Sequence, residues 1–218
     1  MGTKYKIDRL KRISYHGRKN MSSAKYRCRY FAKSQLVRFG CGQSVFEFIN
    51  FRGSLFKQIS FDNAKFHGCD LWGATFNNCK FKNTIFSDCV FMACRFRKCD
   101  FTDALFEYTI VVNTNLSECK NLNHSTGISN YMQYPKNDID SELQSALNIL
   151  KENKNIRKHR LLHLPNNRLN ELNIFLLTRK FGNSVLPKLL LEMNRHSTTT
   201  ITTYKKMELE LNKIRKML

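Results

Sequence analysis

Cysteine is the residue type in this chain that most suggests chemistry. The sequence holds eight cysteines, and cysteine sulfur binds zinc or forms disulfides. Most of them are separated by five residues or a multiple of five, and these are Cys69, Cys79, Cys89, Cys94, Cys99 and Cys119. No Cys-x-x-Cys pair occurs, although such pairs are typical of zinc sites. The spacing therefore indicates a regular architecture rather than a metal site.

Histidine offers the other candidate for chemistry. His159 and His163 are four residues apart and share one face if the segment is helical. Their neighbours are basic or apolar, and no acidic third ligand stands near them, so a metal pair is not predicted. The sequence also lacks a glycine-rich phosphate loop and an HExxH motif. We therefore predict a non-enzyme with no catalytic residue, no metal, no cofactor and no small-molecule substrate.

The elements that position these residues follow from a period of five. An apolar residue returns at nearly every fifth position, at Phe51, Phe56, Phe61, Phe66, Leu71, Phe76, Phe81, Phe86, Phe91, Phe96, Phe101, Phe106, Val111 and Leu116. A small residue stands two positions before most of them. This period fits neither a helix nor a flat strand, so it predicts a solenoid whose chain turns a corner every five residues.

The stretch resembles the pentapeptide repeat family, whose unit is a small residue, a polar residue, Leu or Phe, and two variable residues. The units NCKFK, DCVFM, ACRFR and KCDFT, around Phe81, Phe91, Phe96 and Phe101, carry the resemblance. The resemblance implies a right-handed quadrilateral β-helix with four pentapeptides, about twenty residues, in each coil. The expected fold class is an all-β solenoid with a C-terminal α-helical region.

The expected domain organisation has four parts. They are a basic N-terminal segment or cap at 1–25, the β-helix at 26–122, a linker at 123–137 and an α-helical cap or dimerisation region at 138–218. In this frame most of the cysteines occupy the small inward position, where free cysteine behaves as a small buried apolar residue. Neighbours five apart lie on different faces of a coil, so four ligands do not converge on one metal. We therefore expect structural thiols.

Sorting outward positions by face predicts one broad apolar band over two neighbouring faces. Its members are Trp72, Ile85, Val90, Met92, Leu105, Tyr108, Ile110 and Val112. The other two faces carry polar and charged residues and are expected to be solvated. A folded chain rarely leaves so broad an apolar band open. Two covers remain open at this stage: the chain's own C-terminal helices, or a protein partner or second copy.

The net charge of +20 lies mainly in the flanks. Residues 1–50 carry +10, residues 51–122 carry +2 and residues 123–218 carry +8. Basic flanks indicate nucleic acid, an anionic membrane or an acidic protein as partner, or simply a solvated Lys-rich surface. The basic N-terminal residues that would contact nucleic acid are Arg9, Lys11, Arg12, Arg18, Lys19, Arg27 and Arg29. Without a transmembrane run or a signal peptide, the expected location is cytoplasmic.

Helices are expected after the linker. One begins near Asp138 or Ser141, with Ser141 and Gln144 as a capping box. A second runs from about Asn167 to Phe181, a third begins at Ser184 and a fourth spans about Tyr204 to Leu218. The fourth carries a heptad-like seam, formed by Met207, Leu211, Ile214 and Leu218. This seam predicts homodimerisation or docking.

The leading functional hypothesis is a non-enzymatic interaction scaffold that works within a larger assembly or a homodimer. The alternative is a nucleic-acid-binding accessory protein that uses the basic flanks. The resemblance also suggests protection of type II topoisomerases by mimicry of DNA, but that mechanism needs an acidic rod and this repeat is nearly neutral. Salt separates the first two, because contacts to phosphates weaken steeply as salt rises.

Overall fold

The computed structural model describes residues 22–122, 127–131, 133 and 137–218. The chain divides into two compact units, Met1–Met132 and Gln133–Leu218. The first unit is a parallel β-solenoid of about five turns, and the second is helical. Each unit is described by itself.

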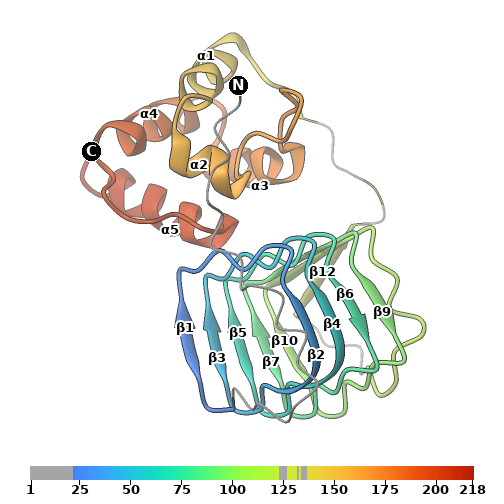
Figure 1. The fold of residues 1–218 in the computed structure, drawn as a ribbon. Helices are drawn as coiled ribbons and strands as arrows, with labels where there is room; N and C mark the ends of the chain where they lie inside the picture. The colour runs from blue at the N-terminus through green and yellow to red at the C-terminus, as the bar shows by residue number, and fades with distance from the viewer. Residues whose placement is uncertain (1–21, 123–126, 132, 134–136) are drawn as a thin grey trace. The chain divides into compact units, whose positions relative to one another are not determined.

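Short parallel strands line three faces of the solenoid (Figure 1). One sheet holds β1 (Lys25–Arg27), β3 (Val45–Glu47), β5 (Lys65–His67), β7 (Ile85–Ser87) and β10 (Leu105–Glu107). A second holds β2 (Gln35–Gly40), β4 (Leu55–Ser60), β6 (Thr75–Asn77) and β9 (Arg95–Arg97). The third holds β8 (Val90–Met92), β11 (Thr109–Val112) and β12 (Ile128–Tyr131). Isolated bridges that join Ser60, Lys80, Asp100 and Lys120 form the fourth face.

The strand register confirms the expected coil length. Phe56 pairs with Phe76 and Phe76 pairs with Phe96, so equivalent positions are separated by four pentapeptides. The inward phenylalanines stack in columns, with ring centroids 4.8 Å apart for both of these pairs. Rings in neighbouring columns meet edge to face, as between Phe56 and Phe61 at 5.5 Å. The core of this unit is therefore a continuous aromatic stack, which fixes the direction of the outward side chains.

The corners between faces use left-handed backbone at every fifth residue. The residue two positions after an inward residue has a positive φ, as in Asn63 (59°), Gly73 (65°) and Asp88 (53°). Gly, Asn and Asp tolerate this conformation, which is uncommon for other residues. Phe48 (53°) and Tyr108 (48°) also adopt it. These two bulky residues stand where the backbone favours small or polar ones.

The last strand of the solenoid lies inside the segment that the sequence predicts as a linker. β12 pairs in parallel with β11, and Val112 lies opposite Tyr131. At Gly127 an added Cβ would lie only 1.8 Å from the Phe106 carbonyl oxygen. Glycine is thus required where the chain enters this strand. The regular five-residue spacing ends at Leu122, but the parallel ladder continues beyond it.

The second unit contains five helices in its described part (Figure 1). They are α1 (Ser141–Leu150), α2 (Lys154–His159), α3 (Glu171–Phe181), α4 (Leu186–His196) and α5 (Tyr204–Arg215). The buried stripe of α1 is formed by Leu143, Ala146, Leu147 and Leu150. The short helix α2 was not predicted from the sequence.

Two helices begin where the sequence predicts, α1 at Ser141 and α5 at Tyr204, whereas the cap of α1 and the start of α3 differ from the prediction. At α1 the cap is Asp140, whose carboxylate accepts from the Leu143 amide at 2.8 Å, so the predicted capping box at Ser141 is wrong. α3 begins at Glu171 instead of Asn167 because Asn167 is left-handed (φ 55°). Gly182 ends α3 as expected (φ 82°). None of the described helices is long and apolar enough to cross a membrane.

Candidate interaction surface

The small inward position is a hydrogen-bonding position as well as a packing position. Hydroxyls there donate to the carbonyl of an inward residue in the preceding coil, as from Thr84 Oγ1 to the Phe61 oxygen at 2.8 Å. Cysteine thiols make the same contact, as from Cys69 to Phe46 at 3.2 Å. The thiol thus replaces a hydroxyl as a weak donor.

Burial favours the protonated form of several of these thiols. It raises the pKa of Cys94, at a small inward position, to about 12, and it has the same effect on Cys41, which stands at one of the large apolar positions. A hydrogen bond with Cys79 lowers the pKa of Cys99. All eight cysteines are free, and residues 22–122, 127–131, 133 and 137–218 contain no cluster of three or more His, Cys, Asp or Glu that could hold a metal ion. A protonated, buried thiol is a poor nucleophile and a poor metal ligand. The geometry agrees with the structural role that the sequence predicts for these residues.

Much of the predicted apolar band lies on the sheet of β8 and β11. The register brings Val90 opposite Ile110 and Met92 opposite Val112. Trp72 stands one coil earlier, and the guanidinium carbon of Arg52 lies 3.9 Å from the centroid of its ring. Val90, Met92 and Val112 are buried, whereas Trp72 and Ile110 are partly exposed. The sequence analysis missed the polar start of this face, where Asn50, Arg52 and Asp70 are also buried.

The exposed part of the band lies on the neighbouring sheet. Leu105 pairs with Ile85 across β10 and β7, and Tyr108 follows at the next corner. Leu105 is 53% exposed and Tyr108 is 82% exposed, whereas Ile85 is partly buried. These three residues, hereafter the Tyr108 patch, present apolar surface next to Glu107, which is also exposed.

One group of side chains on the same sheet contains the residue types of a hydrolase triad. Nδ1 of His67 lies 3.0 Å from Ser87 Oγ and 3.8 Å from Asp88 Oδ2. In a working triad the two imidazole nitrogens face different partners, one the nucleophile and the other the acid. Here the same nitrogen faces both, so this geometry provides no proton relay through the ring.

The two histidines considered as metal ligands are buried in the helical unit. Burial lowers the pKa of His159 to about 4, and the charge of Lys158 adds to the effect. Burial also lowers the pKa of His163. Both rings are therefore neutral near neutral pH. Their environment is that of core residues, and neither belongs to a described group of three ligands.

The predicted dimerisation seam lies on α5, and the exposure of its residues increases toward the C-terminal end. Met207 and Leu211 are buried, Ile214 is partly exposed and Leu218 is 80% exposed beyond the end of the helix. The α5 helix contacts α4 within the helical unit. The apolar residues available to another molecule are thus at the C-terminal end of the seam. Dimerisation through this helix stays a prediction.

The predicted nucleic-acid contacts fall mostly outside the described residues. These are Arg9, Lys11, Arg12, Arg18 and Lys19. Arg27 and Arg29 are described and exposed. Arg27 forms an ion pair with Glu47 on the next coil, with Nε 3.3 Å from Oε2. An exposed pair of this kind contributes little stability and leaves the arginine accessible to other anions.

Comparison with known proteins agrees with the repeat architecture. Residues 59–126 match the family model described as a pentapeptide repeat region. No curated protein sequence matches the chain. A match to HetL, a pentapeptide repeat protein involved in heterocyst differentiation regulation in the cyanobacterium Nostoc sp. strain PCC 7120, has 14% identity and a TM-score of 0.32. It covers 53% of this chain and 52% of HetL, so it spans about half of that protein.

Two further solved structures show similar levels of likeness. Rfr23 from the cyanobacterium Cyanothece 51142 is 15% identical with a TM-score of 0.33, over 51% of this chain and 83% of that one. QnrB1, a plasmid-mediated fluoroquinolone resistance protein, is 12% identical with a TM-score of 0.30, over 61% of this chain and 73% of that one.

Proposed function

This chain belongs to the pentapeptide repeat family, and we propose that it acts without catalysis, as a rigid scaffold that binds another protein through the Tyr108 patch. The stacked phenylalanine core supports rigidity, because inner rings such as that of Phe81 are held between rings of the coils on either side. A rigid surface loses little conformational entropy when it binds.

Tyr108 carries this proposal. Its backbone is left-handed, and the residues at the same corner of the preceding coils are Asp88 and Gly68, which suit that conformation, and Phe48, whose ring is buried. A left-handed non-glycine residue costs roughly 1–2 kcal/mol. With its ring 82% exposed, Tyr108 recovers little of this by burial. Strain without a local benefit is characteristic of residues kept for binding.

The chemistry of the patch fits a protein partner. Tyrosine is enriched among the residues that dominate binding energy at protein interfaces. Leu105 adds aliphatic surface beside it. The partner is a second copy of this chain or another member of a larger assembly, and the cytoplasm is the location expected from the sequence.

Site-specific photo-cross-linking tests the proposal. A benzophenone amino acid is placed at position 108 in cells, and a control chain carries it at Asp103. Asp103 is the matched control because it is also exposed and also left-handed (φ 54°). We expect position 108 to give a defined adduct with one protein, identified by mass spectrometry, and position 103 to give none. Equal labelling at both positions, or none at 108, would contradict the proposal.

Purified protein provides the second readout. If the partner is another copy, sedimentation velocity should show an oligomer that the variant Leu105→Lys shifts toward monomer. A variant that stays oligomeric while position 108 cross-links to a different protein assigns the patch to that other protein.

A further inference from the structure

The outward surface of the sheet formed by β2, β4, β6 and β9 differs in charge from the other faces of the solenoid. From Lys33 to Lys98, every charged residue on this sheet or at its corners is basic, namely Lys33, Arg38, Lys57, Arg95, Arg97 and Lys98. In the next coil, where Asn115 bridges to Arg95, Glu118 stands at the corner equivalent to Lys98. Acids occur on the other three faces, for example at Glu47, Asp62 and Asp70. The nearly neutral repeat therefore has one basic face, and we call it the basic sheet.

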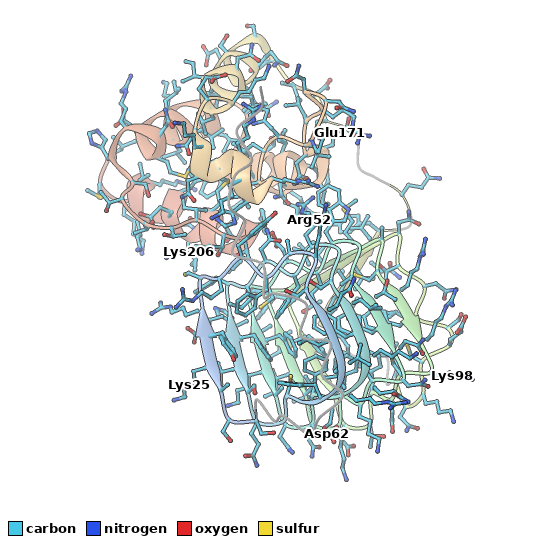
Figure 2. All side chains as sticks on the ribbon, in the orientation of Figure 1. Lys25, Arg52, Asp62, Lys98, Glu171 and Lys206 are labelled. Atoms are coloured by element: carbon cyan, nitrogen blue, oxygen red, sulfur yellow. The ribbon has the colours of Figure 1, made fainter. Side chains whose placement is uncertain are left out.

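The basic side chains are exposed and available. Lys57, Arg95, Arg97 and Lys98 are all exposed, and within the described ranges none of them forms an ion pair with a carboxylate. Figure 2 shows Lys98 pointing away from the solenoid, on a different side from Asp62. Because no described carboxylate forms an ion pair with these four cations, they are accessible to an external anion.

The backbone arranges the cations regularly. Arg95 and Arg97 both point outward from β9 and are two residues apart, about 6.6 Å along the strand. Lys57 lies two strands away from Arg97, about 10 Å across the sheet, with Asn77 between them. Asn77 and Thr75 supply neutral hydrogen-bond donors between the charged rows. Amide and hydroxyl groups of this kind commonly accompany Lys and Arg in contacts to phosphate.

We propose that the basic sheet binds the phosphate backbone of a nucleic-acid duplex without reading its sequence. A duplex carries one charge per about 1.7 Å, so the roughly 14 Å across the four strands match a length of duplex that carries about eight phosphates on its two strands, of which those on the near side face the sheet. This surface is separate from the Tyr108 patch.

The composition of the sheet favours a duplex over other polyanions. Its outward side lacks aromatic residues within the described coils, and binding of unpaired bases relies on aromatic stacking. An acidic protein partner would be expected to meet apolar anchors at the centre of the interface. The apolar side chains here are Val37 and Leu55, and both are partly buried. Regularly spaced charge is the main feature that the sheet offers.

The test compares two variants of the full chain that remove the same charge. The sheet variant carries Arg95→Gln, Arg97→Gln and Lys98→Gln. The control carries Lys65→Gln, Lys80→Gln and Lys82→Gln, which are exposed residues on the other faces. Fluorescence anisotropy follows labelled duplex DNA, duplex RNA and single strands at about 50 and 200 mM salt. Fluorescence of Trp72, the chain's one tryptophan, verifies that both variants are folded.

We expect the sheet variant to lose at least about tenfold in affinity for duplex at the lower salt and its salt slope to fall by about 3, since each phosphate contact contributes about 0.9. The control should change by less than about threefold. The two duplex arms distinguish DNA from RNA as the source of the phosphates.

Several results would overturn the proposal. Equal losses in both variants would mean that only net charge matters, and no loss in either would place binding elsewhere, in the basic flank or helices. Preference for single strands, or displacement of the duplex by polyglutamate at equal charge concentration, would indicate a different polyanion. None of these outcomes affects the Tyr108 proposal, because cross-linking at position 108 is measured separately.

Discussion

Replacement of Phe81 by alanine should destabilise the solenoid more than the same replacement in its first coil. Phe81 is fully buried, and its ring stacks between Phe61 at 5.2 Å and Phe101 at 4.7 Å. Phe→Ala changes in protein cores cost about 3–5 kcal/mol, with the larger values at sites that cannot collapse around the cavity. Backbone hydrogen bonds fix the coil spacing here, including one from the Phe81 amide to the Asp100 oxygen at 2.8 Å. We therefore expect about 4–5 kcal/mol for Phe81→Ala.

Phe31 provides the matched comparison at the end of the stack. It is slightly exposed, and Phe51, 6.0 Å away and tilted, is its neighbour in the next coil. Repeat proteins gain stability from the contacts between neighbouring units, so truncating a residue of the first coil removes fewer contacts and costs less free energy of unfolding. We expect about 2–3 kcal/mol for Phe31→Ala, at the lower end of the range for core truncations. Phe81→Leu, which introduces the residue found at Leu71, should cost less than half as much as Phe81→Ala.

Guanidinium unfolding measures these differences in the unit concerned. Trp72 lies in the solenoid, so its fluorescence reports that unit, while far-ultraviolet circular dichroism is dominated by the helices of the second unit. A loss of 4 kcal/mol should lower the midpoint by about 1 M, given a slope of roughly 4 kcal/mol per molar for guanidinium. A loss below about 1 kcal/mol for Phe81→Ala, or equal losses for Phe81→Ala and Phe31→Ala, would refute a cooperative aromatic stack.

Three further predictions use other parts of the molecule. Tyr108→Asn should leave the free energy of unfolding, followed by Trp72 fluorescence, unchanged or raise it by up to about 1 kcal/mol, because asparagine suits left-handed backbone; a marked decrease would show that the ring stabilises the fold. The helical unit should lose stability as pH falls from about 6.5 to about 4. Over this range His159 becomes protonated in the unfolded chain but stays neutral in the folded chain, where its pKa is about 4, so protonation favours unfolding. Circular dichroism should show this loss in the control His196→Gln, whose histidine is exposed, and a smaller loss in His159→Gln. Ellman's reagent at about pH 8 should modify the partly exposed Cys28 before the buried thiols, and all eight only after unfolding; rapid modification of every thiol in the folded protein would contradict the burial.

The strand register was predictable because the core repeats at one fixed interval. A period of five places Phe56, Phe76 and Phe96 in one column, and no other arrangement buries all three. The left-handed corners were encoded in part, by Gly, Asn or Asp two positions after many of the inward residues, as at Gly53, Asn63 and Asn83. This signal is weaker than the periodicity, because Lys98 and Tyr108 also adopt the left-handed backbone conformation although neither is Gly, Asn or Asp.

The features that escaped prediction depend on single contacts. The strand β12 follows no five-residue period, and its place is set by pairing with β11 and by the close approach at Gly127. Similarly, the choice of Asp140 over Ser141 as a cap depends on which side chain reaches the Leu143 amide. Such contacts are decided by local geometry, whereas the periodicity is decided by the whole core.

In this solenoid the residues that determine the fold and the residues that face outward are different sets, and the sequence alone did not show how the outward residues divide among the faces. The repeat determines the inward residues and the corners, and it leaves outward positions free to vary in charge and size. Sorting these positions by face at first assigned the basic residues to solvated surface, because they were weighed together with the acids of the neighbouring face. The register separates the two: Arg95 and Arg97 share a sheet with Thr75 and Asn77, while Asp100 lies on the bridged face beyond the corner at Lys98. Since neither the basic sheet nor the exposed ring of Tyr108 is needed by the core beneath it, both surfaces can be altered without unfolding the solenoid, and each of the two binding proposals can be tested while the other surface stays intact.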